Sequence, residues 1–165
     1  MEQSNAFIDN KTGKLVIENG RLIYRNFRGE QSQFNHEGDR NFCVFIDNPD
    51  QANLLSEEGW NVKIRKARDE DVVSHYIKVN VSYRFRAPRI FLHAGNTVTE
   101  ITEETVALLD DADILACDLT INPSHWERGD DHGISAYLDS MHVVIQPDYF
   151  ADKYAPEESP FFEAK

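Results

Sequence analysis

The sequence predicts a mainly β domain, an OB-fold-like small barrel with one or two short helices. Five or more stretches alternate apolar and polar residues, which is the pattern of half-buried strands. The two longest stretches flank a polar turn with Gly129 and Gly133 and are typical of a hairpin within residues 112–145. Their apolar face changes phase near Asp139–Ser140, which predicts a β-bulge, and long bent strands of this kind build small barrels. A β-sandwich of different topology is the main alternative.

Turn residues separate the other expected elements. Residues 15–17 and 21–27 predict short strands, and a loop that contains Gly29 and Gly38 leads to a strand over 41–47. Asn48 and Pro49 predict the start of a helix, as N-cap and first helical residue, and Gly59 predicts its end. Further strands are expected at 60–68, 75–83, 89–95 and 97–101, and a second short helix from Thr102 to Leu109.

At 165 residues, the chain has the size of a single domain. Residues 1–20 are expected to be loosely ordered, residues 21–147 to form the domain, and residues 148–165 to be an acidic, aromatic, disordered tail. No apolar run approaches the roughly 20 residues that span a bilayer, and no signal peptide is apparent, so we expect a cytoplasmic protein without a membrane partner. Cys43 and Cys117 belong to no CxxC pair and are expected to be buried free thiols.

The charge is distributed unevenly along the chain. The net charge is −12, but residues 1–98 hold 14 Lys/Arg and 13 Asp/Glu, a net of +1, whereas residues 99–165 hold 3 and 16, a net of −13. An acidic total therefore does not argue against nucleic acid, because a binding face can concentrate positive charge on an acidic protein.

Basic and aromatic residues interleave on the neighbouring strands of the first half. A cationic groove with exposed rings holds single-stranded nucleic acid, because the cations follow the phosphates and the rings stack on bases of any sequence. The alternative is that these are ordinary solvated strand faces and core rings. The candidate nucleic-acid-binding residues are Tyr24, Arg25, Phe27, Arg28, Arg40, Trp60, Lys63, Arg65, Lys66, Tyr83, Arg84 and Arg86.

Five motifs carry a resemblance that covers residues 21–146. RNFRG (25–29), NHEGDRNFCVFI (35–46), EEGWNVK (57–63), INPSHWE (121–127) and GISAYL (133–138) resemble a family of phage-encoded single-stranded-DNA-binding proteins, similar to the T7-type OB-fold replication protein with its acidic tail. The resemblance implies non-catalytic, sequence-independent binding and protection of single-stranded DNA during phage replication or recombination in the bacterial host. It also implies that Trp126 and Tyr137, on the long hairpin, present stacking rings. The tail departs from the family pattern, because Glu163, Ala164 and Lys165 follow the last aromatic residue.

Other interpretations concern the acidic half. Phe161 and Phe162 are expected to dock on a replication or recombination protein or to lie in the chain's own cationic groove, unless the tail only confers solubility. A homodimer is among the possible assemblies. An acidic protein-interaction module or nucleic-acid-mimicking inhibitor is the runner-up function, and a metal-dependent nuclease using Asp110, Asp111, Asp113 and Asp118 is the third. The six histidines show no metal-ligand spacing, so neither a metal nor another cofactor is expected.

Overall fold

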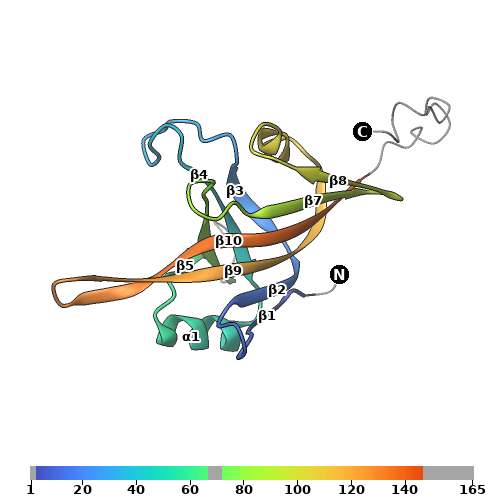
Figure 1. Cartoon of the computed structure of the whole chain (residues 1–165). Helices are drawn as coiled ribbons and strands as arrows, with labels where there is room; N and C mark the ends of the chain where they lie inside the picture. Colours follow the sequence, from blue (N-terminus) through green and yellow to red (C-terminus); the bar gives the residue numbers. More distant parts are fainter. Residues whose placement is uncertain (1–2, 67–71, 147–165) are drawn as a thin grey trace, which may run out of the picture.

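A computed structural model describes residues 3–66 and 72–146 of the chain. These residues form a ten-stranded sheet, one α-helix and one 3₁₀ helix (Figure 1), which confirms the mainly β fold class. The elements are β1 (Asn5–Ile8), β2 (Leu15–Gly20), β3 (Leu22–Asn26), β4 (Arg40–Ile46), α1 (Pro49–Glu58), β5 (Val62–Lys66), β6 (Val73–Val81), β7 (Arg89–Ala94), β8 (Thr97–Ile101), the 3₁₀ helix η1 (Val106–Asp110), β9 (Ile114–Arg128) and β10 (Asp131–Ile145).

Strand β10 is central to the sheet topology. It pairs antiparallel with β9 and parallel with both β6 and β7. The main path runs β1-β2-β9-β10-β6-β4-β3, with β5 added to β6 and β8 to β7. The two ends of this path do not pair, so the sheet is not a fully closed barrel, which corrects the expected closure. Only Arg21 separates β2, which pairs with β9, from β3, which pairs with β4, so the covalent chain joins the two sides there.

Residues 3–20 contain two paired strands, which corrects the expectation of a loosely ordered N-terminal segment. β1 pairs with β2, β2 pairs with β9, and Ala6, Leu15 and Ile17 are buried. Both Ser4 N and Ser4 Oγ donate to Asp47 Oδ2 at 3.0 Å. The sequence predicts only the short strand at residues 15–17 in this segment, and the apolar run of β1 is too short to predict a strand by itself. Both segments become strands because β9, about a hundred residues away in the chain, supplies the pairing edge.

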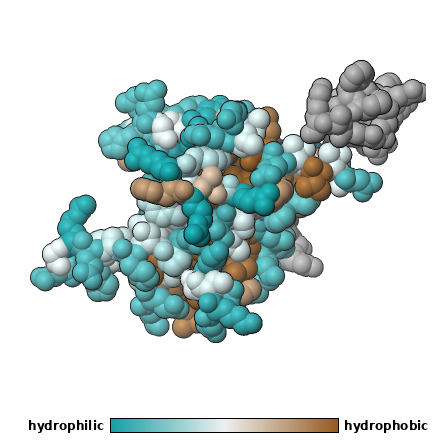
Figure 2. Space-filling model, viewed as in Figure 1, coloured by the Kyte–Doolittle hydropathy of each residue, from teal (hydrophilic) through white to brown (hydrophobic). Residues whose placement is uncertain are grey.

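The long hairpin and its bulge confirm the sequence prediction. β9 and β10 extend beyond the rest of the sheet and end in a hydrophilic tip (Figures 1 and 2). Leu138 and Ser140 pair with consecutive residues of β9, so Asp139 has no partner across the ladder. Because of this extra residue, Leu138 and Met141 both face the core, although they lie three apart.

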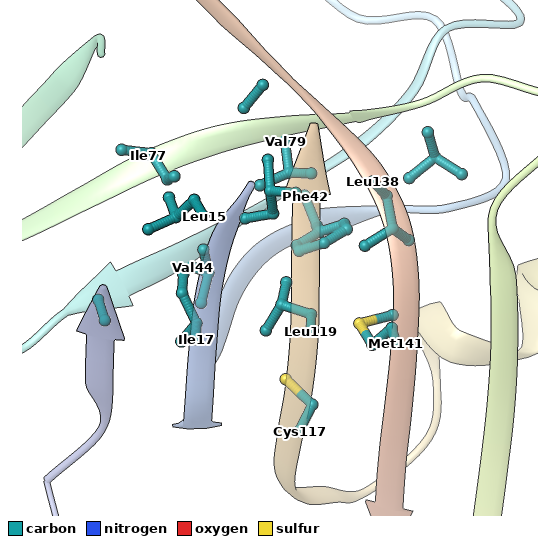
Figure 3. Packing of buried hydrophobic residues seen from close by; sticks show 14 of the residues in the cluster. Leu15, Ile17, Phe42, Val44, Ile77, Val79, Cys117, Leu119, Leu138 and Met141 are labelled. Atoms are coloured by element: carbon teal, nitrogen blue, oxygen red, sulfur yellow. The ribbon is translucent and has the colours of Figure 1, made fainter. Parts of the chain in front are cut away.

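The core lies between the two sides of the curved sheet. Ten of its side chains, from β2, β4, β6, β9 and β10, converge in Figure 3. The rings of Phe27 and Phe42 stack at 5.0 Å between centroids. The labelled residues are Leu15, Ile17, Phe42, Val44, Ile77, Val79, Cys117, Leu119, Leu138 and Met141.

The first helix has the predicted bounds. Asn48 Oδ1 accepts from the backbone N–H of Asp50 at 2.8 Å, and Gly59 ends the helix with φ 110°. The second helix is not the predicted α-helix from Thr102 to Leu109. Thr105 Oγ1 accepts from Thr102 N at 3.0 Å, which makes a turn there, and the 3₁₀ helix η1 begins only after it.

Candidate nucleic-acid interface

The outer face of β6 presents polar residues at every second position. Tyr76, Lys78 and Asn80 point outward, and Ile77 and Val79 between them are buried. The adjoining strands add residues to the same face. Lys63 of β5 pairs with Tyr76, and Tyr137 of β10 pairs with Asn80. Since directly opposed residues of paired strands share one face, β5, β6 and β10 together present a continuous outer surface.

Two hollows join on this surface. One, of about 630 Å³, lies beside the half of the long hairpin that is nearer its turn and is lined by Trp126 and Ser135. The other, of about 760 Å³, lies beside β3 and the following loop and is lined by Tyr24, Phe34 and Tyr76. Lys63 and Lys78 line both hollows and therefore mark where they meet. We call this joint surface, from Trp126 and Ser135 through Lys63 and Lys78 to Tyr76, Tyr24 and Phe34, the β6 groove.

Lys63 and Lys78, which line both hollows, are unpaired within the described residues, whereas Arg28, which lines only the hollow beside β3, pairs with carboxylates. Within residues 3–66 and 72–146, no salt bridge involves Lys63, Lys78 or the neighbouring cations of β5, Arg65 and Lys66. Arg65 shares the face of Lys63, whereas Lys66 points to the opposite face of the ribbon. Arg84 and Arg86, in the exposed loop after β6, are also unpaired within the described ranges. In contrast, Lys14, Arg21, Arg28, Arg40 and Arg89 each pair with a carboxylate.

Aromatic rings with free surface lie along the groove. Tyr24 is 55% exposed, Phe34 87% and Trp126 43%. The ring of Tyr24 contacts that of Tyr76 edge to face, with 5.8 Å between centroids. Tyr24 also has a φ of 53°, in the left-handed region that bulky residues rarely adopt. Strained backbone of this kind persists where the surrounding structure holds it, often at functional sites.

Two of the predicted stacking residues are core residues instead. Phe27 is 0% exposed and Trp60 is 4% exposed, so neither ring has a face free for a base. Trp60 forms an isolated β-bridge with Ile134, and Phe27 stacks on Phe42. Both rings lie at the end of an element, where alternation does not show which side faces the core.

Two arginines that the sequence predicts to bind phosphate make intramolecular contacts instead. Arg25 Nη1 donates to the carbonyl oxygens of Leu109 and Ala112, both at 2.8 Å. The guanidinium of Arg28 pairs with Asp111 at 2.6 Å and with Asp110 at 3.2 Å. Both arginines thus tie β3 and the following turn to η1.

A third hollow, of about 470 Å³, brings together four more predicted residues. Arg40, Tyr83, Arg84 and Tyr137 line it, and Asn80 lines both this hollow and the one beside Trp126. Arg40 pairs with Glu103 at 3.3 Å and lies over the ring of Tyr83, 5.6 Å from its centroid. Burial raises the pKa of Tyr83. Arg84 is the unpaired cation of this hollow.

The sequence prediction omitted several residues that the structure brings into the groove. Phe34, Tyr76, Lys78 and Asn80 line it, although none of them was among the candidates. The signal for three of them is present in the sequence, because HYIKVNV alternates polar and apolar residues and puts Tyr76, Lys78 and Asn80 on one face. Phe34 lies in a loop, where periodicity gives no indication.

The aspartates of the nuclease interpretation do not converge. Asp110 accepts from the backbone N–H groups of Phe27 and Arg28 at 2.6 and 3.0 Å, and Asp118 accepts from Asn19 N at 2.8 Å. In the part of the chain that the structure describes, no three His, Cys, Asp or Glu side chains are placed to hold a metal ion. Nor does any helix there have the length and apolarity to cross a membrane. Phe161 and Phe162 lie outside the described residues.

Comparisons with known proteins give a family for the chain and similar folds. A family model described as a putative phage ssDNA-binding domain matches residues 5–165. The fold is similar to the C-terminal truncation of the single-stranded DNA-binding protein from bacteriophage Enc34, with 13% identity, a TM-score of 0.53, and coverage of 84% of this chain and 89% of that one. It is also similar to the Enc34 protein in complex with ssDNA, with 16% identity, a TM-score of 0.50, and coverage of 84% and 88%. No curated protein matches the sequence.

Proposed function

The chain belongs to the family of phage single-stranded-DNA-binding domains, and we propose that it holds the strand in the β6 groove without reading its sequence. The observation that carries this proposal is which cations lack a carboxylate partner. Lys63 and Lys78 are unpaired within the described residues and lie where the two hollows meet, whereas Arg21, Arg28, Arg40 and Arg89 each pair with a carboxylate. An unpaired cation can exchange its counterions for phosphates, and this exchange drives binding to a single strand.

The rest of the groove suits a strand of any sequence. Exposed rings stack on every base, since all four bases have a π-face. The proposed role is therefore binding without catalysis, which protects exposed single strands during phage replication or recombination in the cytoplasm of the infected bacterium.

The test is a titration of the full chain with fluorescent oligo-dT at several salt concentrations. Each phosphate contact to a single strand contributes about 0.7 to the slope of log K against log salt, so Lys63→Ala with Lys78→Ala should lower that slope by about 1.4. Lys11→Ala is the matched control, because Lys11 lies in the β1–β2 turn and lines none of the three hollows. A folded double variant with the wild-type slope would place the strand elsewhere on the protein.

A further inference from the structure

Trp126 and Gly133 face each other across the long hairpin, where β9 and β10 pair in register. A Cβ atom built on Gly133 would lie 2.8 Å from Cζ2, 3.0 Å from Cε2 and 3.2 Å from Nε1 of the Trp126 indole. These atoms belong to both rings of the indole, so the ring system lies against the backbone at Gly133. A Cβ atom at this position would require the indole to move, because real Cβ atoms essentially never approach another heavy atom within 3.0 Å.

The backbone itself does not require glycine at this position. The glycines with positive φ are Gly13, Gly29, Gly38, Gly59, Gly95 and Gly129, and Gly133 is not among them. Glycine in a strand interior weakens the strand, and one that lacks a conformational reason marks a close approach by another group. Here the group that approaches is the Trp126 ring.

The neighbouring residue anchors this part of the hairpin to the domain. Ile134 is buried, its backbone N–H donates to the carbonyl oxygen of Gly59 at 3.0 Å, and it bridges to Trp60. One side of the indole is thus held by an anchored strand, while 43% of Trp126 is exposed. Both Trp126 and Gly133 line the β6 groove beside Lys63.

We propose that Gly133 is a positioning residue for single-stranded DNA. It gives the Trp126 indole a seat on the hairpin, so that the other side of the ring forms a fixed stacking platform at one end of the groove. A ring that is already held in place loses little conformational entropy when a base stacks on it. The inference rests on the proposed function and adds the residue that orients its stacking ring.

The test is Gly133→Ala, which suits the backbone and disturbs only the ring. Displacement of the indole should weaken oligo-dT binding as much as Trp126→Ala does, between about 5-fold and about 150-fold for one stacked base. The thermal unfolding midpoint should stay that of the wild type. In a Trp126→Ala background, Gly133→Ala should have no further effect on affinity, because the two residues act as one unit. His125→Ala is the control, since it removes an exposed ring from the opposite face of the same strand.

The outcomes separate this proposal from the one on which it rests. If Gly133→Ala binds like wild type while Trp126→Ala does not, Gly133 has no positioning role. If both variants bind like wild type while the Lys63 and Lys78 double variant is weakened, the platform is wrong and the groove stands. If the unaltered chain does not bind oligo-dT, the proposed function itself fails.

A second measurement decides the question should Gly133→Ala not fold. In the full chain with Trp60→Phe, Trp126 is the only source of tryptophan fluorescence, because the sequence has two tryptophans. A seated indole shows no fast local rotation in time-resolved anisotropy of the free protein, and oligo-dT quenches it. Fast rotation in the free protein would overturn the proposal.

Discussion

Arg25 and Lys63 are two cations of one surface that differ in their hydrogen-bonding and ion-pair partners. Both line the hollow beside β3. The guanidinium of Arg25 donates to two carbonyl oxygens at the end of η1, at 2.8 Å each, whereas Lys63 has no carboxylate partner within the described residues. Arg25 therefore stabilises the fold, whereas Lys63 is available to bind a phosphate.

Arg25→Ala should therefore destabilise the protein without changing the salt dependence of its DNA binding. Loss of hydrogen bonds from a charged donor costs about 1.5–3 kcal/mol of unfolding free energy, which urea denaturation would measure. The salt slope of oligo-dT binding should stay that of the wild type. Arg65→Ala is the comparison and should give the reverse result, an unchanged unfolding free energy and a lower slope. A reduced slope in a folded Arg25→Ala variant would show that Arg25 binds phosphate.

The bulge at Asp139 connects separate strands of the sheet. Its carboxylate accepts from Lys14 Nζ at 2.9 Å and from Thr120 Oγ1 at 2.8 Å, so it ties the start of β2 to the middle of the long hairpin. Burial alone would raise the pKa of Asp139, but its hydrogen bonds to Lys14, Thr120 and Asn122 and the charge of Lys14 together lower it. The ionised form is thus the one that stabilises the bulge.

This pKa direction predicts how stability depends on pH. Because the pKa of Asp139 is lower in the folded state than its usual value of 3.8, the stabilisation is complete above that value and is lost as the pH falls through the folded-state pKa. Asp139→Asn should therefore lower the thermal midpoint at pH 5 more than at pH 2. The control is Asp131→Asn at the exposed hairpin tip. An equal loss for Asp139→Asn at both pH values would contradict the ionic role.

Ion pairs between the two halves of the chain determine where unpaired positive charge remains on the molecule. Glu100, Glu103, Asp110 and Asp111, all from the acidic half of the chain, pair with Arg89, Arg40 and Arg28 of the first half. Within the described residues, most cations without a carboxylate partner lie on β5, β6 and the loop after β6. A protein with a net charge of −12 thereby presents a cationic groove.

The C-terminal tail, residues 148–165, lies outside the described residues and has 5 Asp/Glu and 2 Lys, a net of −3. Its removal should tighten oligo-dT binding at low salt, because a tethered anionic segment would no longer compete for the groove. The gain should disappear at about 1 M salt, where the Debye length is only about 3 Å. Phe161→Ala with Phe162→Ala keeps the charge and should leave affinity unchanged. If truncation leaves affinity unchanged at every salt concentration, the tail does not compete for the groove.

Much of the local structure could be predicted from the sequence because neighbouring residues decide it. Asn48, Pro49 and Gly59 bound α1 through their own backbone preferences and hydrogen bonds. The change of phase in the second long strand indicated the bulge at Asp139, since a strand can keep one face buried only if an extra residue is inserted. The interleaving of cations and rings predicted a nucleic-acid surface, and the proposed groove includes Tyr24, Lys63 and Trp126 from that prediction.

Only the tertiary structure decided which of those residues are free to bind. Arg28 is neutralised by Asp110 and Asp111, more than eighty residues further along the chain, and this pairing depends on where η1 lies against β3. Phe27 is buried by Phe42 across the core, and Trp126 is seated on Gly133 across the hairpin. The physical reason is that periodicity assigns a side chain to a face, whereas burial, ion pairing and close approach depend on what the folded sheet brings to that face from distant parts of the chain.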